Sequence, residues 1–418
     1  MRNETTLGEL RLHLDRNDIL DFEYLRALSY QAYGGAAIGE ILYVVQRYQR
    51  SGASRAAWVD SWSAQGRMLR RLAEDASSKN HLASARSFYL RGYNYLRAAE
   101  FYFDRKKYGS EAHRDLYREE AACFDAAVAL FELPVEKVAI PYLPEVDMPG
   151  YFFKPTREAG RMPTIVICGG GDSFGEETYF TGGVREALDR GFNVLVFHGP
   201  GQRGLLVEHP EQIFRPDYEV PIGCLIDYLL SRGDVDPGRL GLYGYSFGGY
   251  LAPRAAAFDK RIKALAANAL VPQPQHLLRQ AMLTQVPALA RPVAEPMLIP
   301  IIEQAMRISW VLAATVEQSM WWPSGTESVE SYLRRLDDFN LEGLAERITC
   351  PVLCTIGVGE GQASLDGSRA FFDLLPNRGK TYIKLTAEMG ADNHVGLNNI
   401  PYTSGVIFDW FSDVFGLP

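Results

Sequence analysis

The chain has 418 residues, of which 47% are hydrophobic and 22% are charged, enough to bury a large core in two or three structural units. Its net charge is −8, with both signs mixed along the sequence. It contains no basic stripe of the kind that binds nucleic acid, so a nucleic-acid partner is not expected.

Three further features bound the class of protein. The residues that follow Met1 are polar, so a secretory signal is not expected. The most apolar helical pattern, over 296–322, is interrupted by charged residues, which favours a cap or core helix over a membrane span. Five scattered cysteines give no set of zinc ligands. We therefore expect a cytoplasmic protein with reduced thiols, no metal and no membrane partner.

The first third of the chain has helical periodicity. From about residue 7 to residue 132, apolar residues recur at spacings of three and four, and few prolines interrupt them. Aromatic residues such as Trp58 and Trp62 are dense here, and packing between helices is the simplest account of them. We predict an all-helical N-terminal domain over residues 1–132.

The periodicity changes to that of strands after residue 132. Strand-like apolar runs occupy residues 137–142, 150–154, 164–168, 193–198, 240–244, 262–269, 352–356 and 381–385. Helical patterns separate the later runs, which predicts an α/β fold with a parallel sheet covered on both faces, over residues 133–418. Residues 271–345 break this alternation with proline-punctuated helical sequence, and we expect them to form a helical lid over the carboxyl edge of the sheet.

The segment Gly244–Gly249 has the pattern of a nucleophile elbow. The apolar run before it predicts a buried strand, and the small residues after it predict a helix. A serine at such a turn, Ser246, projects its hydroxyl above the sheet. Gly244 and Gly248 fit because a Cβ at either position would collide where strand and helix cross. The amide of Phe247 would then supply half of an oxyanion hole.

A second segment, Gly171–Gly175, matches the same G-x-S-x-G pattern around Ser173. The residues that follow it are too bulky and polar for a helix pressed against its own strand. We therefore predict Ser246 as the nucleophile and Ser173 as a loop residue beside the oxyanion site. Asp172, Ser173 and Tyr245 are candidate substrate contacts.

A serine nucleophile requires a base and an acid that orients the base. His394 lies in a glycine-bearing loop after the last predicted strand, which is the place expected for the base. The acid is expected just after the strand 352–356, where Glu360 stands, with Asp366 as the alternative and Asp392 as a residual candidate. Residue order leaves the choice among these three open.

The second oxyanion donor is expected in the loop that follows the run 164–168. Gly170 and Gly171 there let the backbone approach a ligand closely. A dinucleotide or phosphate loop is the rival interpretation, but neither glycine-rich consensus is present, so no cofactor is expected. His198 opens the turn HGPGQR after the next strand, and we expect it to pack there.

These motifs together resemble one group of α/β-hydrolases. The shared features are the helical N-terminal domain, GPGQ at 199–202, GYSFGG at 244–249 and GADNH at 390–394. The group includes the 2,6-dihydroxypseudooxynicotine hydrolase, fungal polyketide-shortening hydrolases of pigment pathways and the fermentation–respiration switch protein. The resemblance implies cofactor-free, serine-dependent hydrolysis, often of a carbon–carbon bond, and a homodimer. The group usually has aspartate as triad acid, a small residue at position 203 and cysteine at 395, where this chain has Glu360, Arg203 and Val395.

We therefore predict a serine hydrolase that cleaves a C–C bond of a ketone or β-dicarbonyl, or an ester or lactone, in an aromatic or polyketide-like small molecule. One alternative is an acyltransferase or cyclase of natural-product assembly that uses the same Ser–His pair. Another is a regulatory binding protein whose triad is a relic, since fold alone does not establish function.

Overall fold

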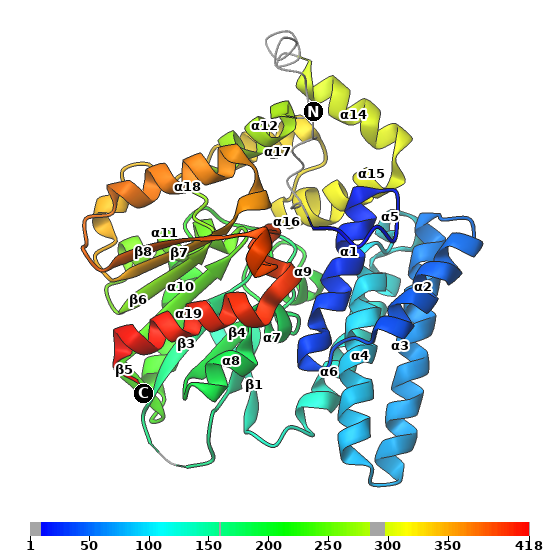
Figure 1. The fold of residues 1–418 in the computed structure, drawn as a ribbon, viewed down its shortest axis with the longest axis horizontal. Helices are drawn as coiled ribbons and strands as arrows, with labels where there is room; N and C mark the ends of the chain where they lie inside the picture. The colour runs from blue at the N-terminus through cyan, green and yellow to red at the C-terminus, as the bar shows by residue number, and fades with distance from the viewer. Residues whose placement is uncertain (1–9, 159, 285–296, 418) are drawn as a thin grey trace. The chain divides into compact units, whose positions relative to one another are not determined.

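The computed structural model describes residues 10–158, 160–284 and 297–417. The chain forms two compact units. The helical unit comprises Arg11–Val135 and Met306–Gln318, and the sheet unit is built on Glu136–Ala305 and Ser319–Pro418. Figure 1 shows the course of the chain through its elements.

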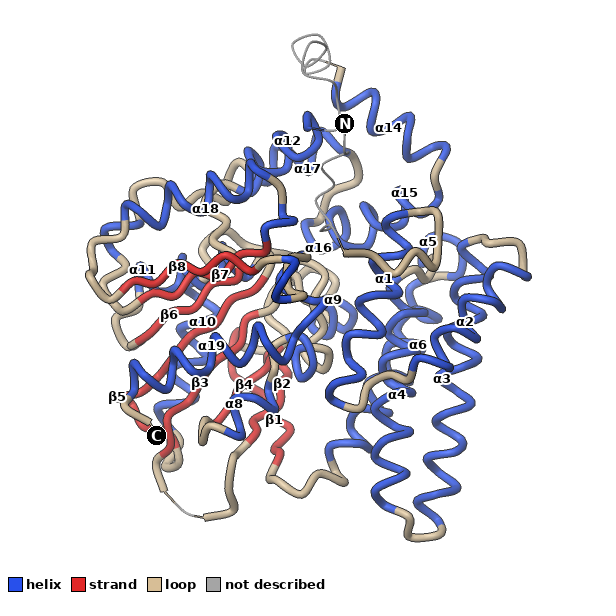
Figure 2. The backbone as a smooth tube through the Cα atoms, in the orientation of Figure 1, coloured by secondary structure: helices blue, strands red, loops and turns tan. Residues whose placement is uncertain are grey.

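The helical unit contains six helices before the first strand, and Figure 2 shows this part of the chain almost wholly as helix and loop. They are α1 (Asp18–Ser29), α2 (Ile38–Arg50), α3 (Arg55–Ser78), α4 (Leu82–Phe101), α5 (Arg105–Tyr108) and α6 (Ser110–Val128). Polar side chains cap several of them: Asn17 accepts from the first-turn amides of α1, and Ser54 does so for α3.

The aromatic residues of this unit form its core, as their periodicity predicts. Trp58 is 1% exposed and Trp62 is fully buried, and their ring centroids lie 5.5 Å apart. Tyr24 and Tyr95 pack against Trp62. The indole N–H of Trp58 donates to the carbonyl of Ala98 at 2.7 Å, so its polar atom is satisfied within the core.

A buried amide joins α4 to the chain around α1. Asn94 is fully buried, and its Nδ2 donates to the carbonyl of Ala27 at 2.9 Å and to that of Gly35 at 2.8 Å. One side chain therefore satisfies two carbonyls that no solvent reaches at this point of the helix interface.

The sheet unit contains eight strands in the order β1-β2-β4-β3-β5-β6-β7-β8. They are β1 (Val135–Leu143), β2 (Val146–Phe153), β3 (Met162–Cys168), β4 (Asn193–Phe197), β5 (Val235–Tyr245), β6 (Ala264–Asn268), β7 (Val352–Gly357) and β8 (Lys380–Leu385). All eight predicted strands exist, but the sheet is mixed. β2 pairs antiparallel with β4, whereas β3 to β8 pair in parallel. The prediction of a parallel sheet is wrong for the first two strands, because the two-residue connection from β1 to β2 permits only a hairpin.

Helices cover both faces of this sheet. α8 (Val184–Asp189) and α19 (Ile400–Phe415) lie on one face, where α19 crosses in front of the strands in Figure 1. α10 (Glu219–Ser231), α11 (Gly248–Phe258) and α18 (Gln362–Leu374) pack on the other. Side chains of successive residues in β5 point to opposite faces of the sheet. Tyr243 contacts Phe408 of α19, and Leu242 packs in the core with α10 and α11.

The insertion between β6 and β7 is helical, as predicted for a lid. Its described helices are α12 (Pro274–Thr284), α14 (Leu298–Ile308), α15 (Trp310–Val316), α16 (Trp322–Ser324) and α17 (Val329–Leu336). The segment 306–318 belongs to the helical unit, where Trp310 packs edge-on against Tyr102 and Glu317 pairs with Arg55 at 3.3 Å. From Ser319 onward the insertion belongs to the sheet unit.

No single helix in the described ranges has the length and apolar character needed to span a membrane. One bent pair, Leu298–Ile308 with Trp310–Ser324, meets that criterion when its two parts are taken together.

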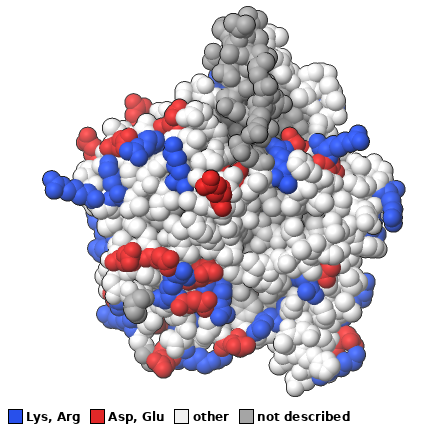
Figure 3. Space-filling view, in the orientation of Figure 1, with Lys and Arg blue, Asp and Glu red and all other residues white. Residues whose placement is uncertain are grey.

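Charges of both signs are interspersed on the face drawn in Figure 3. Charged side chains of the chain also form local ion pairs, such as those of Arg190 with Glu186 and with Asp409. The mixture seen in the sequence therefore persists on this face of the molecule.

Replacing Asn94 by leucine should destabilise the helical unit. The change leaves the carbonyls of Ala27 and Gly35 without their donor, and a buried unsatisfied group costs about 1–3 kcal/mol. We expect a lower thermal midpoint when helix content is followed by circular dichroism. Gln49→Leu is the matched control, because that amide also donates to a carbonyl, that of Leu14, but in an exposed position. Equal midpoints for the two variants would contradict the assigned role of Asn94.

Candidate active site

Ser246 lies at the turn between β5 and α11 with φ of 57°, a left-handed conformation that non-glycine residues rarely adopt. Its amide donates to the carbonyl of Asn268 at 2.8 Å. A Cβ added at Gly244 would lie 2.1 Å from the carbonyl oxygen of Gly248, and one added at Gly248 would lie 2.3 Å from that of Cys168. The predicted reason for both glycines is confirmed: strand, helix and the end of β3 meet with no room for a side chain.

The structure brings together three of the predicted residues. The Oγ of Ser246 lies 3.0 Å from Nε2 of His394, and Nδ1 of His394 lies 2.8 Å from Oε2 of Glu360. The second oxygen of Glu360 accepts from the amide of Val395 at 3.0 Å. With Nδ1 facing a carboxylate, the neutral imidazole carries its proton there, which leaves Nε2 free to accept from the serine hydroxyl.

The loop that carries His394 is held by amide side chains. Asn393 caps the amide of His394 with its Oδ1 at 2.7 Å, and the Nδ2 of Asn268 at the end of β6 donates to the carbonyl of Val395 at 2.8 Å. Asn268 thus contacts both sides of the site, since its own carbonyl accepts from Ser246. These contacts fix the imidazole relative to the serine.

The two other candidate acids lie elsewhere. Asp366 is on α18, where its Oδ1 accepts from Gln362 at 2.7 Å in an exposed position. Asp392 is fully buried and accepts from the Nδ2 of Asn398 at 2.8 Å. Of the three candidate carboxylates, Glu360, three residues after β7, is the one at hydrogen-bond distance from Nδ1 of His394.

The glycine loop after β3 lies beside the serine. A Cβ added at Gly170 would lie 2.8 Å from Oγ of Ser246 and 3.2 Å from the amide nitrogen of Phe247. A Cβ added at Gly171 would lie 3.8 Å from the Cβ of Phe247, so Gly171 is next to that side chain. The backbone of this loop and the amide of Phe247 therefore border the same space above the hydroxyl, as an oxyanion hole requires.

Ser173 and Tyr245 meet in a buried hydroxyl cluster. The hydroxyl of Tyr245 lies 3.0 Å from those of Ser173 and Thr178, and Ser173 is 4% exposed. Burial raises the pKa of Tyr245, so its hydroxyl stays protonated and available as a donor. These contacts favour a role in holding the loop over contact with substrate, while Asp172 beside them is half-buried. The second G-x-S-x-G match thus presents its serine to the protein interior.

Sequence reasoning missed the part played by the turn 198–203. It predicted packing for His198 and assigned no chemistry to Gln202, yet both side chains contact the glycine loop. The GPGQ motif at 199–202 was the available signal, but a motif does not name the atoms that its residues contact.

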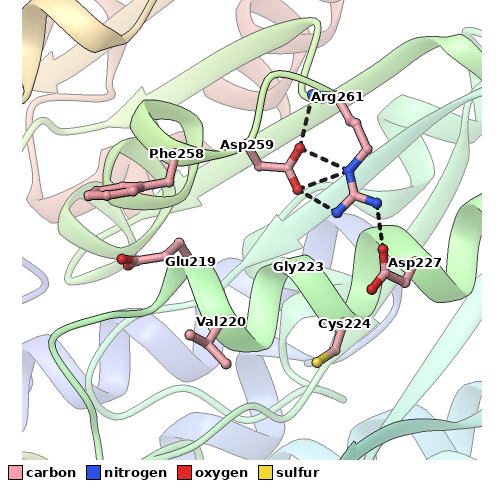
Figure 4. A pocket seen from close by; sticks show the side chains of 8 residues that line it. All are labelled: Glu219, Val220, Gly223, Cys224, Asp227, Phe258, Asp259 and Arg261. Carbon is pink, nitrogen blue, oxygen red and sulfur yellow. Dashed lines mark hydrogen bonds and ion pairs between the residues drawn. The ribbon is translucent and has the colours of Figure 1, made fainter.

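Two grooves elsewhere include none of Ser246, Glu360 and His394. The groove in Figure 4, of about 450 Å³, lies along α10 and the end of α11, where Arg261 pairs with Asp259 and Asp227. A groove of about 790 Å³ in the helical unit is lined by residues of α3, α5 and α6. In the described ranges no three His, Cys, Asp or Glu side chains gather as metal ligands.

No protein-family model matches the chain. It is 31% identical over 378 residues to the α/β hydrolase xenA of Xenoacremonium sinensis, covering 84% of each chain. It is 33% identical over 261 residues to the 20-hydroxy-prefusarin hydrolase FUS2 of Gibberella moniliformis, covering 59% of each. The solved 2,6-dihydroxy-pseudo-oxynicotine hydrolase aligns with a TM-score of 0.71 at 18% identity, over 92% of this chain and 95% of that one, a likeness of fold.

The left-handed backbone at Ser246 predicts a difference in stability between two variants that lack the hydroxyl, Ser246→Gly and Ser246→Ala. Glycine adopts φ of 57° without the Cβ clash that costs other residues about 1–2 kcal/mol, so Ser246→Gly should be more stable than Ser246→Ala. The control is Ala370→Gly on the exposed face of α18, which should lose about 1 kcal/mol. Thermal midpoints test both. The same sign of change at the two positions would contradict a strained elbow.

Proposed function

Because the chain belongs to the α/β-hydrolase family of its fungal relatives and is therefore a hydrolase, we propose that it acts through a serine nucleophile. In this proposal Ser246 attacks, His394 is the general base and Glu360 orients the histidine. The observation that carries it is the continuous hydrogen-bonded chain from Oγ of Ser246 through both ring nitrogens of His394 to Glu360.

The chemistry follows from that chain. Oγ of Ser246 bonds to the carbonyl carbon of the substrate while its proton passes to Nε2 of His394. The imidazolium that forms is stabilised by Glu360, whose other oxygen is held by the amide of Val395. The tetrahedral intermediate carries its negative charge on the former carbonyl oxygen, which the amides of Phe247 and of the Gly170–Gly171 loop stabilise.

Collapse of the intermediate breaks the bond to the leaving group, which takes the proton from His394. Water, deprotonated by the same histidine, then attacks the acyl-enzyme and releases the acid and free Ser246. A carbon leaving group needs an adjacent carbonyl or aryl group to carry the developing charge. A β-dicarbonyl or aryl ketone satisfies that need, and an ester or lactone satisfies it through oxygen.

The proposed substrate class is an aromatic or polyketide-like secondary metabolite. It is supported by the fungal relative named for 20-hydroxy-prefusarin and by the likeness of fold to the hydrolase named for 2,6-dihydroxy-pseudo-oxynicotine. The departures of this chain from the group, Glu360, Arg203 and Val395, fall beside the site and are compatible with a substrate of its own.

Ser246→Ala should abolish turnover of an activated ester such as 4-nitrophenyl acetate, with a loss on the order of 10⁶-fold if the triad acts as a unit. A fluorophosphonate probe should label the parent protein on the peptide that carries Ser246. Ser173 is the internal control, because it stands in the same G-x-S-x-G pattern and is buried. Labelling on Ser173, or unchanged turnover in the variant, would refute the assignment.

Glu360→Gln should lower kcat by about 10⁴-fold with little effect on KM, because an amide facing Nδ1 favours the wrong tautomer of His394. Asp366→Asn is the matched control, since that carboxylate contacts only Gln362 on the surface, and it should change kcat less than about twofold. Steady-state kinetics measures both. A larger loss for Asp366→Asn than for Glu360→Gln would reverse the assignment of the acid.

A further inference from the structure

The turn from His198 to Arg203 packs against the glycine loop. It connects β4 to α9 (Arg203–Glu208), and His198, Gln202 and Arg203 are each at most 3% exposed. None of the three belongs to the triad. Each contacts a different point of the segment Gly169–Glu176, which borders the serine.

His198 contacts the far end of this loop. Its Nδ1 accepts from the amide of Gly175 at 3.2 Å and from that of Gly204 at 2.9 Å. A nitrogen that accepts carries no proton, so the ring proton lies on Nε2, which is 3.1 Å from Oε2 of Glu176. His198 therefore joins the glycine loop to the start of α9.

Gln202 contacts the near end. Its Nε2 donates to the carbonyl of Gly169 at 3.1 Å, and its Oε1 accepts from the amide of Gly199 at 2.8 Å. The carbonyl of Gly169 and the amide of Gly170 belong to one planar, trans peptide, so their C=O and N–H point in opposite directions. Fixing the oxygen on Gln202 thus fixes the direction of the Gly170 N–H.

This constraint matters because the peptide joins two glycines. Glycine has little steric preference between backbone conformations, so the preference of the two glycines alone does not keep a Gly–Gly peptide in one orientation. An oxyanion donor is effective when it is aimed before the charge develops. Gln202 supplies from outside the loop the rigidity that the loop lacks.

Arg203 contacts the middle of the loop and the lid. Its amide donates to the carbonyl of Ser173 at 3.1 Å. Its guanidinium lies between two rings, 4.9 Å from the centroid of Phe174 and 4.8 Å from that of Trp322 in the lid. Arginine suits this place because a planar cation stacks on both faces.

We infer that Gln202 is a positioning residue that orients the Gly169–Gly170 peptide as an oxyanion donor, with His198 and Arg203 holding the rest of the loop. The inference rests on the proposed function for its catalytic meaning, while the restraint of the loop can be measured without activity.

The kinetic test uses Gln202→Glu and Gln202→Ala in the full chain. Glutamate keeps the acceptor for Gly199 and loses the donor to Gly169. We expect kcat on 4-nitrophenyl acetate to fall about 10²-fold with KM within about twofold. The inhibition constant of phenylboronic acid, which forms a tetrahedral adduct, should weaken by a similar factor. Gln212→Glu and Gln212→Ala are the controls, because the side-chain amide of Gln212 donates to Glu211 in an exposed position, while its backbone carbonyl, which accepts from Gly201, is unchanged by either substitution.

The second measurement is hydrogen exchange of the peptide that covers residues 168–178, followed by mass spectrometry. Exchange should be several-fold faster in the Gln202 variants than in the parent and the Gln212 variants. Unchanged exchange overturns the inference whatever the kinetics show, and so does faster exchange with kcat within twofold of the parent. If the parent neither turns over ester nor reacts with a fluorophosphonate, the proposed function fails, and exchange alone decides whether Gln202 restrains the loop.

Discussion

The close crossing of β5, α11 and the end of β3 at Ser246 is the constraint on which the site depends. Three backbone segments meet there at distances that exclude a Cβ at Gly244 and Gly248. The serine at the crossing takes a left-handed conformation, which directs its side chain away from the sheet and leaves the amide of Phe247 at the first turn of a helix. The proposed nucleophile and the proposed oxyanion donor are thus placed by one backbone geometry, before any other side chain contributes.

The rest of the site reaches this crossing through the parallel part of the sheet. β3 to β8 pair in parallel, so the loops that follow β3, β6 and β7 leave the sheet at the same edge as Ser246. Those loops carry Gly170, the lid and Glu360, and the chain after β8 returns His394 to the carboxylate. Asn268 at the end of β6 contacts both Ser246 and Val395, which ties the two most separated parts of the proposed triad to the strand between them.

Patterns that depend on local geometry or chain order could be predicted from the sequence. The eight strands are of this kind, and so is the meeting of Ser246 with His394, because a strand-turn-helix elbow and the chain order of the proposed catalytic residues can be read from the sequence. The orienting acid could not be chosen from the sequence, because Glu360 and Asp366 follow β7 only six residues apart. Which carboxylate can reach Nδ1 of His394 depends on the tertiary structure. The antiparallel start of the sheet was not predicted either, because the expected runs 137–142 and 150–154 are seven residues apart, whereas β1 and β2 extend to within two residues of each other.

The turn 198–203 illustrates what sequence patterns do not reveal. Its role depends on which carbonyl Gln202 contacts. That carbonyl belongs to Gly169, 33 residues earlier in the chain, and only the tertiary structure brings the two together. Glycine has no Cβ, which leaves room for a reacting oxygen beside the loop. The same missing Cβ removes the steric preference that would hold the loop in one conformation. Buried donors elsewhere in the fold can then restrain the loop. Gln202 is such a donor, because its Oε1 is held by the amide of Gly199 while its Nε2 donates to the carbonyl of Gly169. We therefore infer that the two segments act together: the glycine loop lets the substrate oxygen approach the backbone, and the HGPGQR turn orients the Gly169–Gly170 peptide toward it.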